Sequence, residues 1–223
     1  MKLYMHPGAC SLSPHIVCRE LGLPIELIEV DRATHRTSTG EDFYGISGNG
    51  YVPALKLEDG TVLTEGPAIV QYLAELRPQA TLLPKSGTID RARVQSWLNF
   101  ITSELHKPMV LMFRPPYAPV KSTLFELVQK RLDWLATQIA GPYLTGETFT
   151  VADAYLFVVL NWSPWLEIDL GRWPVLQAFE ARVGARPRVQ EALTAEGLAP
   201  FGEEHTFYAP PAMAHAARQA ARP

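Results

Sequence analysis

The chain has 223 residues, of which 47% are hydrophobic and 19% are charged, and its formal net charge is −3. This composition excludes wholesale disorder, and the length suffices for one large domain or two small ones. The small negative charge argues against a nucleic acid as the main partner. No apolar run approaches the ~20 residues that cross a bilayer, and His6-Pro7-Gly8 follows the first five residues too soon for a signal peptide. We therefore expect a cytoplasmic protein without a membrane partner.

The cysteine and histidine content argues against a disulfide framework and against a metal site. The only cysteines are Cys10 and Cys18, and the six histidines are scattered. A secreted fold stapled by disulfides would use more cysteines, and this spacing matches no zinc pattern. We expect no metal.

Up to about residue 77 the predicted elements are short and alternate in type. The pattern predicts, in order, a strand at 3–5, a helix at 14–21, a strand at 25–30, strands at 54–57 and 61–63, and a helix at 68–76. Ser13 is the expected N-cap of the first helix, which Gly22 and Pro24 stop. Glu58-Asp59-Gly60 is a strong hairpin turn. The first two strands should be parallel through a right-handed crossover, which makes a small α/β unit.

Residues 78–88 contain two prolines and a glycine and are interpreted as a linker. Beyond them, apolar residues at helical spacing predict helices at 89–106, 121–139, 155–160, 175–183 and 187–193. Thr150 and Asp153 have the spacing of a capping box before the third of these helices. The second domain should therefore be all-α. The stretch from Phe201 on is expected to be poorly ordered or draped on the surface.

Cys10 ends the loop Pro7-Gly8-Ala9 just before the first predicted helix, where free N–H groups favour a thiolate. A dithiol redox protein would carry its second cysteine at position 13, but Ser13 stands there. Exchange with an external thiol is therefore the redox chemistry left open. Placement alone does not distinguish this role from that of a small packed residue. Cys18 lies among apolar neighbours in the predicted helix and is expected to be buried and inert.

Two further segments could hold a peptide-like ligand. A cis peptide at Val52-Pro53 would turn the N–H and C=O of Val52 toward the Cys10 loop, where they could pair with an extended peptide. At Glu65-Gly66 a strand gives way to a helix whose first N–H groups would bind a carboxylate, while Glu65 takes an ammonium. The alternative is that Glu65 only serves the helix start, where an acidic residue is favoured.

Asn99, Ser103 and His106 share one face of a predicted helix, and Lys107 follows them. Pro108 should bend or end this helix and so expose these polar side chains. The alternative is an ordinary polar face turned toward solvent.

Taken together, these motifs resemble those of a known family, the bacterial beta-class glutathione transferases. The resemblance covers roughly residues 1–200 and rests on the segments 1–15, 52–53, 63–73, 97–100, 106–107 and 149–157. It implies an α/β N-terminal thioredoxin-like domain at 1–80, a linker at 81–87, an all-α C-terminal helical bundle domain at 88–200 and a tail at 201–223. It also implies a homodimer.

The resemblance further implies glutathione as co-substrate, with Cys10 and His106 as catalytic residues. The family places the cysteinyl sulfur of glutathione beside Cys10. The full glutathione-binding set implied is Ala9, Cys10, His35, Tyr51, Val52, Pro53, Glu65, Gly66, Asn99, Ser103, Glu104, His106 and Lys107, with Asn99, Ser103 and Glu104 lining the cleft in part from the other subunit. The candidate apolar wall for the second substrate is Phe113, Tyr155, Trp162 and Trp165. His35 departs from the family pattern, because close relatives often have a lysine there, near the glycyl carboxylate.

The expected activity is conjugation of glutathione thiolate to small hydrophobic electrophiles, with glutathione-dependent thiol-disulfide exchange through Cys10 as a second activity. The alternatives are a regulatory binding protein of the same fold and a ligand-storage protein. Such binding relatives typically lose the site residues, whereas Cys10, Glu65, His106 and Lys107 are all present here.

Overall fold

The N-terminal part of the chain forms a four-stranded mixed sheet. The computed structural model describes residues 1–202. The strands are β1 (Lys2–Met5), β2 (Glu26–Glu29), β3 (Ala54–Lys56) and β4 (Val62–Thr64), in the spatial order β2-β1-β3-β4. β1 and β2 are parallel, while β3 and β4 form an antiparallel hairpin. Both pairings confirm the sequence prediction.

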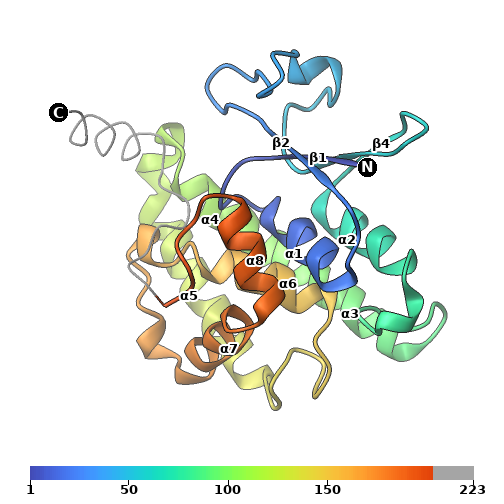
Figure 1. Cartoon of the computed structure of the whole chain (residues 1–223). Helices are drawn as coiled ribbons and strands as arrows, with labels where there is room; N and C mark the ends of the chain where they lie inside the picture. The colour runs from blue at the N-terminus through green and yellow to red at the C-terminus, as the bar shows by residue number, and fades with distance from the viewer. Residues whose placement is uncertain (203–223) are drawn as a thin grey trace.

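The two faces of this sheet are covered differently. Helices α1 (Leu12–Leu21) and α2 (Gly66–Glu75) lie on the face turned toward the helical part of the molecule (Figure 1). The loop between β2 and β3 covers the other face, where Phe43 is fully buried in a small cluster with Tyr4 and three further residues, Ile28, Val30 and Ala54. The sheet is therefore shielded on both sides, although only one side carries long helices.

The start of α1 corrects one prediction. The helix begins at Leu12, so Ser13 is not its N-cap but lies buried inside the first turn. Ser11 precedes the helix and uses its hydroxyl elsewhere, accepting from the N–H of His6 and donating to the carbonyl of His6. The helix can start early because Pro14 falls within the first turn, where N–H groups have no acceptor in the helix anyway. At the other end Gly22 adopts φ 61° and closes the helix as predicted.

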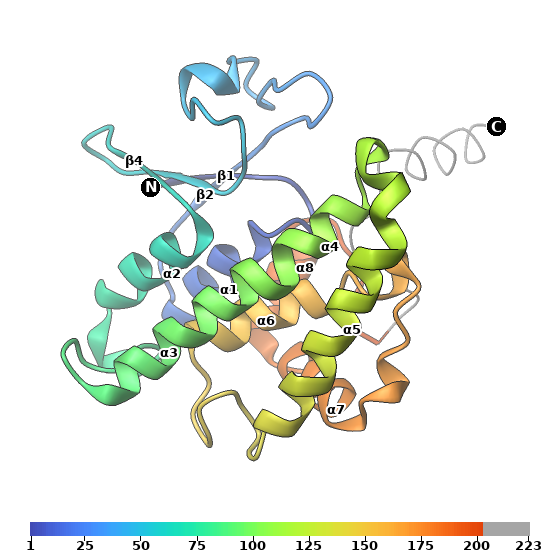
Figure 2. The same cartoon turned by 180° about the vertical axis from the view of Figure 1, so that it is seen from behind.

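Within the described residues the C-terminal part consists of helices and the loops that join them, with no strand. Its helices are α3 (Ile89–Phe100), α4 (Lys107–Met112), α5 (Lys121–Gln138), α6 (Val151–Leu160), α7 (Pro174–Gly184) and α8 (Pro187–Ala195). Figure 2 shows α3 running on into α4, with α5 beside them. The N-terminal sheet domain and this helical domain confirm the predicted fold class.

A π-helical segment, Ile101–His106, joins α3 to α4. Of the two outcomes predicted at Pro108, a bend or an end of the helix, the end is excluded, because the chain remains helical up to Met112. The wider π turn lets the helix continue past Pro108, whose nitrogen has no hydrogen to donate to the preceding turn. The hydroxyl of Thr102 supplies a partner for the carbonyl of Leu98 at 2.8 Å.

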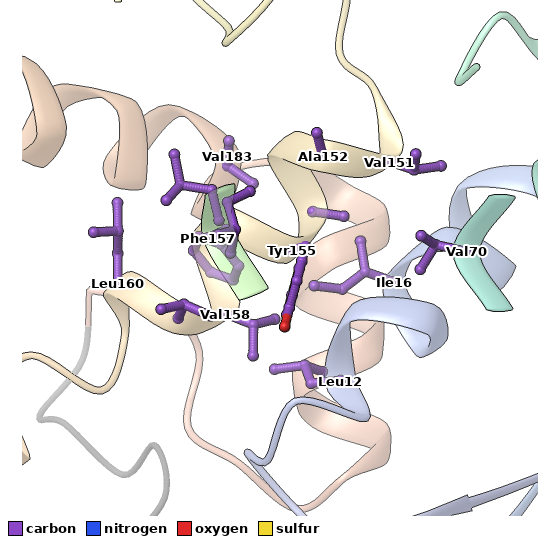
Figure 3. Close-up of a cluster of buried hydrophobic side chains, with 14 of the residues drawn as sticks. Leu12, Ile16, Val70, Val151, Ala152, Tyr155, Phe157, Val158, Leu160 and Val183 are labelled. Atoms are coloured by element: carbon purple, nitrogen blue, oxygen red, sulfur yellow. The ribbon is translucent and has the colours of Figure 1, made fainter. Parts of the chain in front are cut away.

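Helix α6 is the centre of the core. Each of its residues is buried, and the helix packs against both α1 and α7 (Figure 3). Its start is the predicted capping arrangement: the Asp153 carboxylate accepts from the N–H and the hydroxyl of Thr150, both at 2.7 Å, and from the N–H of Leu144 at 2.8 Å. Leu12 and Ile16 of α1 join the same hydrophobic cluster, so one continuous core connects the two domains.

No helix within residues 1–202 is long and apolar enough to cross a membrane. The prediction for the tail falls outside the described residues, apart from its first two positions. Phe201 packs against Phe157, with ring centroids 5.7 Å apart.

Candidate active site

A cavity of about 750 Å³ lies between the two domains. From the N-terminal domain it is lined by the loop before α1, the segment before β3 and the start of α2; from the helical domain it is lined by the π segment, α4 and α6. The volume is within the range of small-molecule sites, which are commonly found between domains.

Cys10 and Val52 are in direct contact in this cavity. The Val52-Pro53 peptide bond is cis, as predicted, and the carbonyl of Val52 accepts a hydrogen bond from the Cys10 thiol at 3.3 Å. The carbonyl thus faces the Cys10 loop as the sequence prediction required.

The protonation state of Cys10 differs from the prediction. Burial raises its pKa to about 12, and the backbone N–H groups of Cys10 and Ser11 lower it by less than burial raises it. At neutral pH Cys10 is therefore a thiol that donates to Val52, not a thiolate. Cys18 is fully buried, and burial raises its pKa to about 12 as well, which agrees with an inert residue.

Glu65 and Gly66 stand at the N-terminus of α2 and line the cavity. Glu65 has a φ of 68°, and its backbone carbonyl accepts from the N–H groups of Ala68 and Ile69. A carboxylate and a helix N-terminus thus lie side by side. Such an arrangement can hold the ammonium and the carboxylate of an amino-acid group.

His106 comes from the π segment and contacts two aromatic residues of the cavity wall. Its Nδ1 is hydrogen-bonded to the Tyr155 hydroxyl, and its ring centroid lies 5.0 Å from that of Trp162. Burial, and next the positive charge of Lys107, lower the pKa of His106 to about 4. The imidazole is therefore neutral at pH 7. The Tyr155 hydroxyl carries one proton, which it can donate to Nδ1 of the neutral ring.

Comparison with known proteins explains this arrangement. Residues 8–76 match the family model of the glutathione S-transferase N-terminal domain, and residues 100–187 match that of the C-terminal domain. The structure of BphK, a bacterial glutathione S-transferase solved as a ternary complex, is 52% identical with a TM-score of 0.87 and covers 89% of this chain and 100% of its own. The chain belongs to the glutathione S-transferase family.

Two further solved structures define the class. A beta-class glutathione S-transferase from Sphingomonas chungbukensis is 43% identical, with a TM-score of 0.86. A sphingomonad glutathione S-transferase complexed with glutathione is also 43% identical, with a TM-score of 0.85. Each covers 89% of this chain and 100% of its own. The protein is thus an enzyme of the bacterial beta class of glutathione S-transferases.

Most of the residues predicted for glutathione line the cavity of this glutathione S-transferase; the two exceptions are Asn99 and Glu104. Asn99 is exposed, and Glu104 forms an ion pair with Arg131. The π segment accounts for Asn99, because its wider turn rotates the helix and separates Asn99 from the face that carries His106. That these residues line a cleft from the other subunit stays a prediction.

Of the four residues predicted for the apolar wall, Phe113, Tyr155 and Trp162 line the cavity, whereas Trp165 does not. Trp165 follows Pro164 in a short 3-10 turn beyond α6. Trp162 also contacts the Cys10 loop, since its indole N–H donates to the carbonyl of Gly8 at 3.0 Å.

Sequence reasoning missed two arginines of the cavity wall, Arg32 and Arg114. Arg32 lies in the loop after β2, where no element was predicted. Arg114 follows α4, and its guanidinium carbon lies 5.5 Å from the centre of the Tyr51 ring. The only signal in the sequence was the position of Arg32 three residues before His35.

Within residues 1–202, no group of histidine, cysteine, aspartate or glutamate side chains could hold a metal ion.

Proposed function

We propose that this enzyme transfers the thiolate of glutathione to small hydrophobic electrophiles. The observation that carries the proposal is the meeting in one cavity of Cys10, the Val52 backbone and Glu65 at the α2 N-terminus with an aromatic wall from the helical domain. A relative at 43% identity was solved as a complex with glutathione, which supports the choice of thiol.

Each end of the binding site suits one part of the tripeptide. Glu65 would pair with the γ-glutamyl ammonium, and the first N–H groups of α2 would bind the adjacent carboxylate. The Val52 backbone would pair with the cysteinyl amide in the manner of a β-strand. Because the Cys10 thiol now donates to the Val52 carbonyl, glutathione would displace it and leave the Cys10 Sγ beside the ligand sulfur.

The raised pKa of Cys10 gives this residue a definite part in conjugation. A thiol that stays protonated at neutral pH can donate a hydrogen bond to the glutathione thiolate and so stabilise it. The glutathione proton goes to solvent, because His106, with a pKa of about 4, is too weak a base to hold it. The thiolate then attacks the electrophilic carbon, a C–S bond forms, and the leaving group departs with its electron pair.

We propose thiol-disulfide exchange as a second, slower activity of Cys10. Its sulfur, as the thiolate, would attack the glutathione sulfur of a mixed disulfide between glutathione and a second thiol, release that second thiol as its thiolate and retain the glutathione as a disulfide on Cys10. A further glutathione thiolate would then resolve it. Ser13 in place of a second cysteine favours this monothiol route, and the raised pKa of Cys10 makes it slow at neutral pH.

We also propose a homodimer. Three large apolar side chains on α3 and α5 are exposed, namely Ile89 (68%), Trp134 (44%) and Leu127 (37%). Trp134 packs against Phe100, with ring centroids 4.7 Å apart, and so forms an aromatic surface cluster. A stable interface of more than about 1,000 Å² would cover it. Light scattering at micromolar concentration should give twice the chain mass, and a monomer there would contradict the proposal.

A conjugation assay with glutathione and 1-chloro-2,4-dinitrobenzene tests the main proposal. We expect saturable turnover and, by calorimetry, binding of glutathione. Absence of binding at millimolar glutathione would exclude the proposed function. Binding without turnover of any electrophile would favour the ligand-storage or regulatory alternative.

A further inference from the structure

Two arginines from different domains face the same cavity. Arg32 lies in the loop after β2, and Arg114 follows α4 in the helical domain. Both are half-buried. The Arg114 guanidinium lies over the ring of Tyr51, which also lines the cavity, so its position is fixed by a side chain of the N-terminal domain.

The two guanidinium groups are close enough to repel each other. Burial lowers the pKa of Arg32, and the positive charge of Arg114 lowers it further. Two like charges in a partly buried cavity raise the free energy of the folded chain. An anion bound between them would replace this repulsion by two attractions. A carboxylate suits the arrangement, because a guanidinium can donate two parallel hydrogen bonds to it.

The charges of the cavity complement those of glutathione. Among the described lining residues the side chains with fixed charge are three cations, Arg32, Lys107 and Arg114, and one carboxylate, Glu65. Glutathione with an ionised thiol carries the inverse set: two carboxylates and a thiolate against one ammonium. Glu65 matches the ammonium, which leaves three cations for three anionic groups.

Arg32 and Cys10 line the same cavity, which points to the glycyl end of the ligand as the group near Arg32. The charge of Arg32 acts on the Cys10 thiol, beside which the glutathione sulfur would lie. The glycyl carboxylate is one residue further along the tripeptide, and an extended chain spans roughly 3.5 Å per residue. His35, which also lines the cavity, has its ring stacked on Tyr44 with centroids 4.6 Å apart, and Arg32 is the arginine of this loop that lines the cavity.

We propose that Arg32 and Arg114 together form a site for one ligand carboxylate, and that the glycyl carboxylate of glutathione is the group bound there. This inference rests on the proposed function. An acid group on the electrophile is the other source of the same chemistry, and the experiment below separates the two sources.

The first arm compares glutathione with its glycyl monoethyl ester, which lacks only that charge, in conjugation of the uncharged 1-chloro-2,4-dinitrobenzene. We expect Arg32→Gln and Arg114→Gln each to raise the KM for glutathione about 10-fold or more, the effect of losing a hydrogen bond to a charged group. The KM for the ester, already high in the wild type, should change less than about 2-fold, because no carboxylate remains to lose its partner. Turnover at saturation should change little.

Arg36→Gln is the matched control. Arg36 lies in the same loop with the same charge, but it is exposed and donates to the carbonyl of Gly40 at 3.1 Å. It should leave both KM values unchanged. Arg32→Lys should restore part of the preference for glutathione over its ester, which a merely structural defect would not allow.

The second arm compares 4-chloro-3-nitrobenzoate with its methyl ester as electrophiles. The arginine variants could instead raise the KM for the acid electrophile alone and leave the ratio of the KM values for glutathione and its ester unchanged. The carboxylate bound would then be that of the electrophile. The assignment to the glycyl carboxylate would be wrong, although the carboxylate site itself would stand. Variants that affect charged and esterified ligands equally overturn the site itself. A wild type that neither binds glutathione nor turns over either electrophile refutes the proposed function instead.

Discussion

The carboxylate of Glu196, just beyond α8, accepts a hydrogen bond from the backbone N–H of Gly8 at 2.9 Å. Gly8 has a φ of 70° in the loop that leads to Cys10. The other Glu196 oxygen lies 2.9 Å from Nδ1 of His15, whose Nε2 accepts from Arg19 at 3.1 Å. Because an arginine only donates, the proton of a neutral His15 ring must be on Nδ1, facing Glu196. Glu196, at the end of the helical domain, thus holds the loop that leads to Cys10.

Replacement of Glu196 should therefore affect both stability and activity. In Glu196→Gln the amide can accept one of the two hydrogen bonds but turns its NH₂ toward the other donor. One buried donor then lacks a partner, and we expect unfolding free energy to fall by about 2 kcal/mol. Urea unfolding measures the loss. The control is Glu191→Gln on α8, whose ion pair with Arg188 is exposed to solvent and should leave the unfolding free energy almost unchanged. Equal effects of the two changes would contradict this role of Glu196.

The low pKa of His106 predicts a particular dependence of stability on pH. In the unfolded chain His106 takes up a proton near pH 6.5, whereas the folded chain resists it down to about pH 4. The stabilisation from the neutral ring is therefore complete above pH 6.5 and is lost as the pH falls to 4, by on the order of 3 kcal/mol. In His106→Gln the unfolding free energy should therefore decrease less between pH 7 and pH 4 than it does in the wild type. Urea unfolding at both pH values measures this difference. An NMR titration of the His106 ring with a midpoint near 6.5 would show the prediction to be wrong.

The elements that sequence analysis predicted correctly are those fixed by local chemistry. The Glu58-Asp59-Gly60 turn forces a hairpin, and the Asp153 carboxylate accepts from the N–H of Thr150 only three residues earlier in the sequence. The π segment at Ile101–His106 was missed because the one local cue, Pro108, is equally compatible with a helix end. The cap of α1 was misplaced because Ser11 and Ser13 are both acceptable cap residues, and only the contacts of Ser11 with His6 decide between them.

The candidate site shows the same division. Cys10, Val52 and Glu65 lie beside turns and helix starts, so a short motif identifies each of them. Glu196 is 188 residues from Gly8 in the sequence, and no local pattern links the two. Arg32 and Arg114 are likewise far apart in the sequence, and they line the same cavity only because the two domains pack together. Long-range partners of this kind need the three-dimensional structure.

Glu65→Gln should weaken glutathione binding without unfolding the protein. The amide keeps the shape of the side chain but removes the charge that would pair with the γ-glutamyl ammonium. Loss of a hydrogen bond to a charged group predicts a decrease of about 1.5–3 kcal/mol in binding free energy, measured by calorimetry. Glu75→Gln, at the far end of α2, is the control and should bind like the wild type. Unchanged affinity in Glu65→Gln would remove Glu65 from the binding site.

Cys10→Ser should separate the two proposed activities. A serine hydroxyl can still donate to the Val52 carbonyl and to a bound thiolate, so conjugation should fall only modestly. Exchange with a mixed-disulfide substrate uses the Cys10 sulfur itself as nucleophile and should be abolished. Cys18→Ser is the control and should retain both activities, because Cys18 is buried away from the cavity. After treatment with glutathione disulfide, mass spectrometry should find one glutathione adduct, on Cys10. Since its pKa is raised to about 12, the adduct should form about tenfold faster for each pH unit between 7 and 9. An adduct on Cys18, or full exchange activity in Cys10→Ser, would show that Cys10 is not the nucleophile.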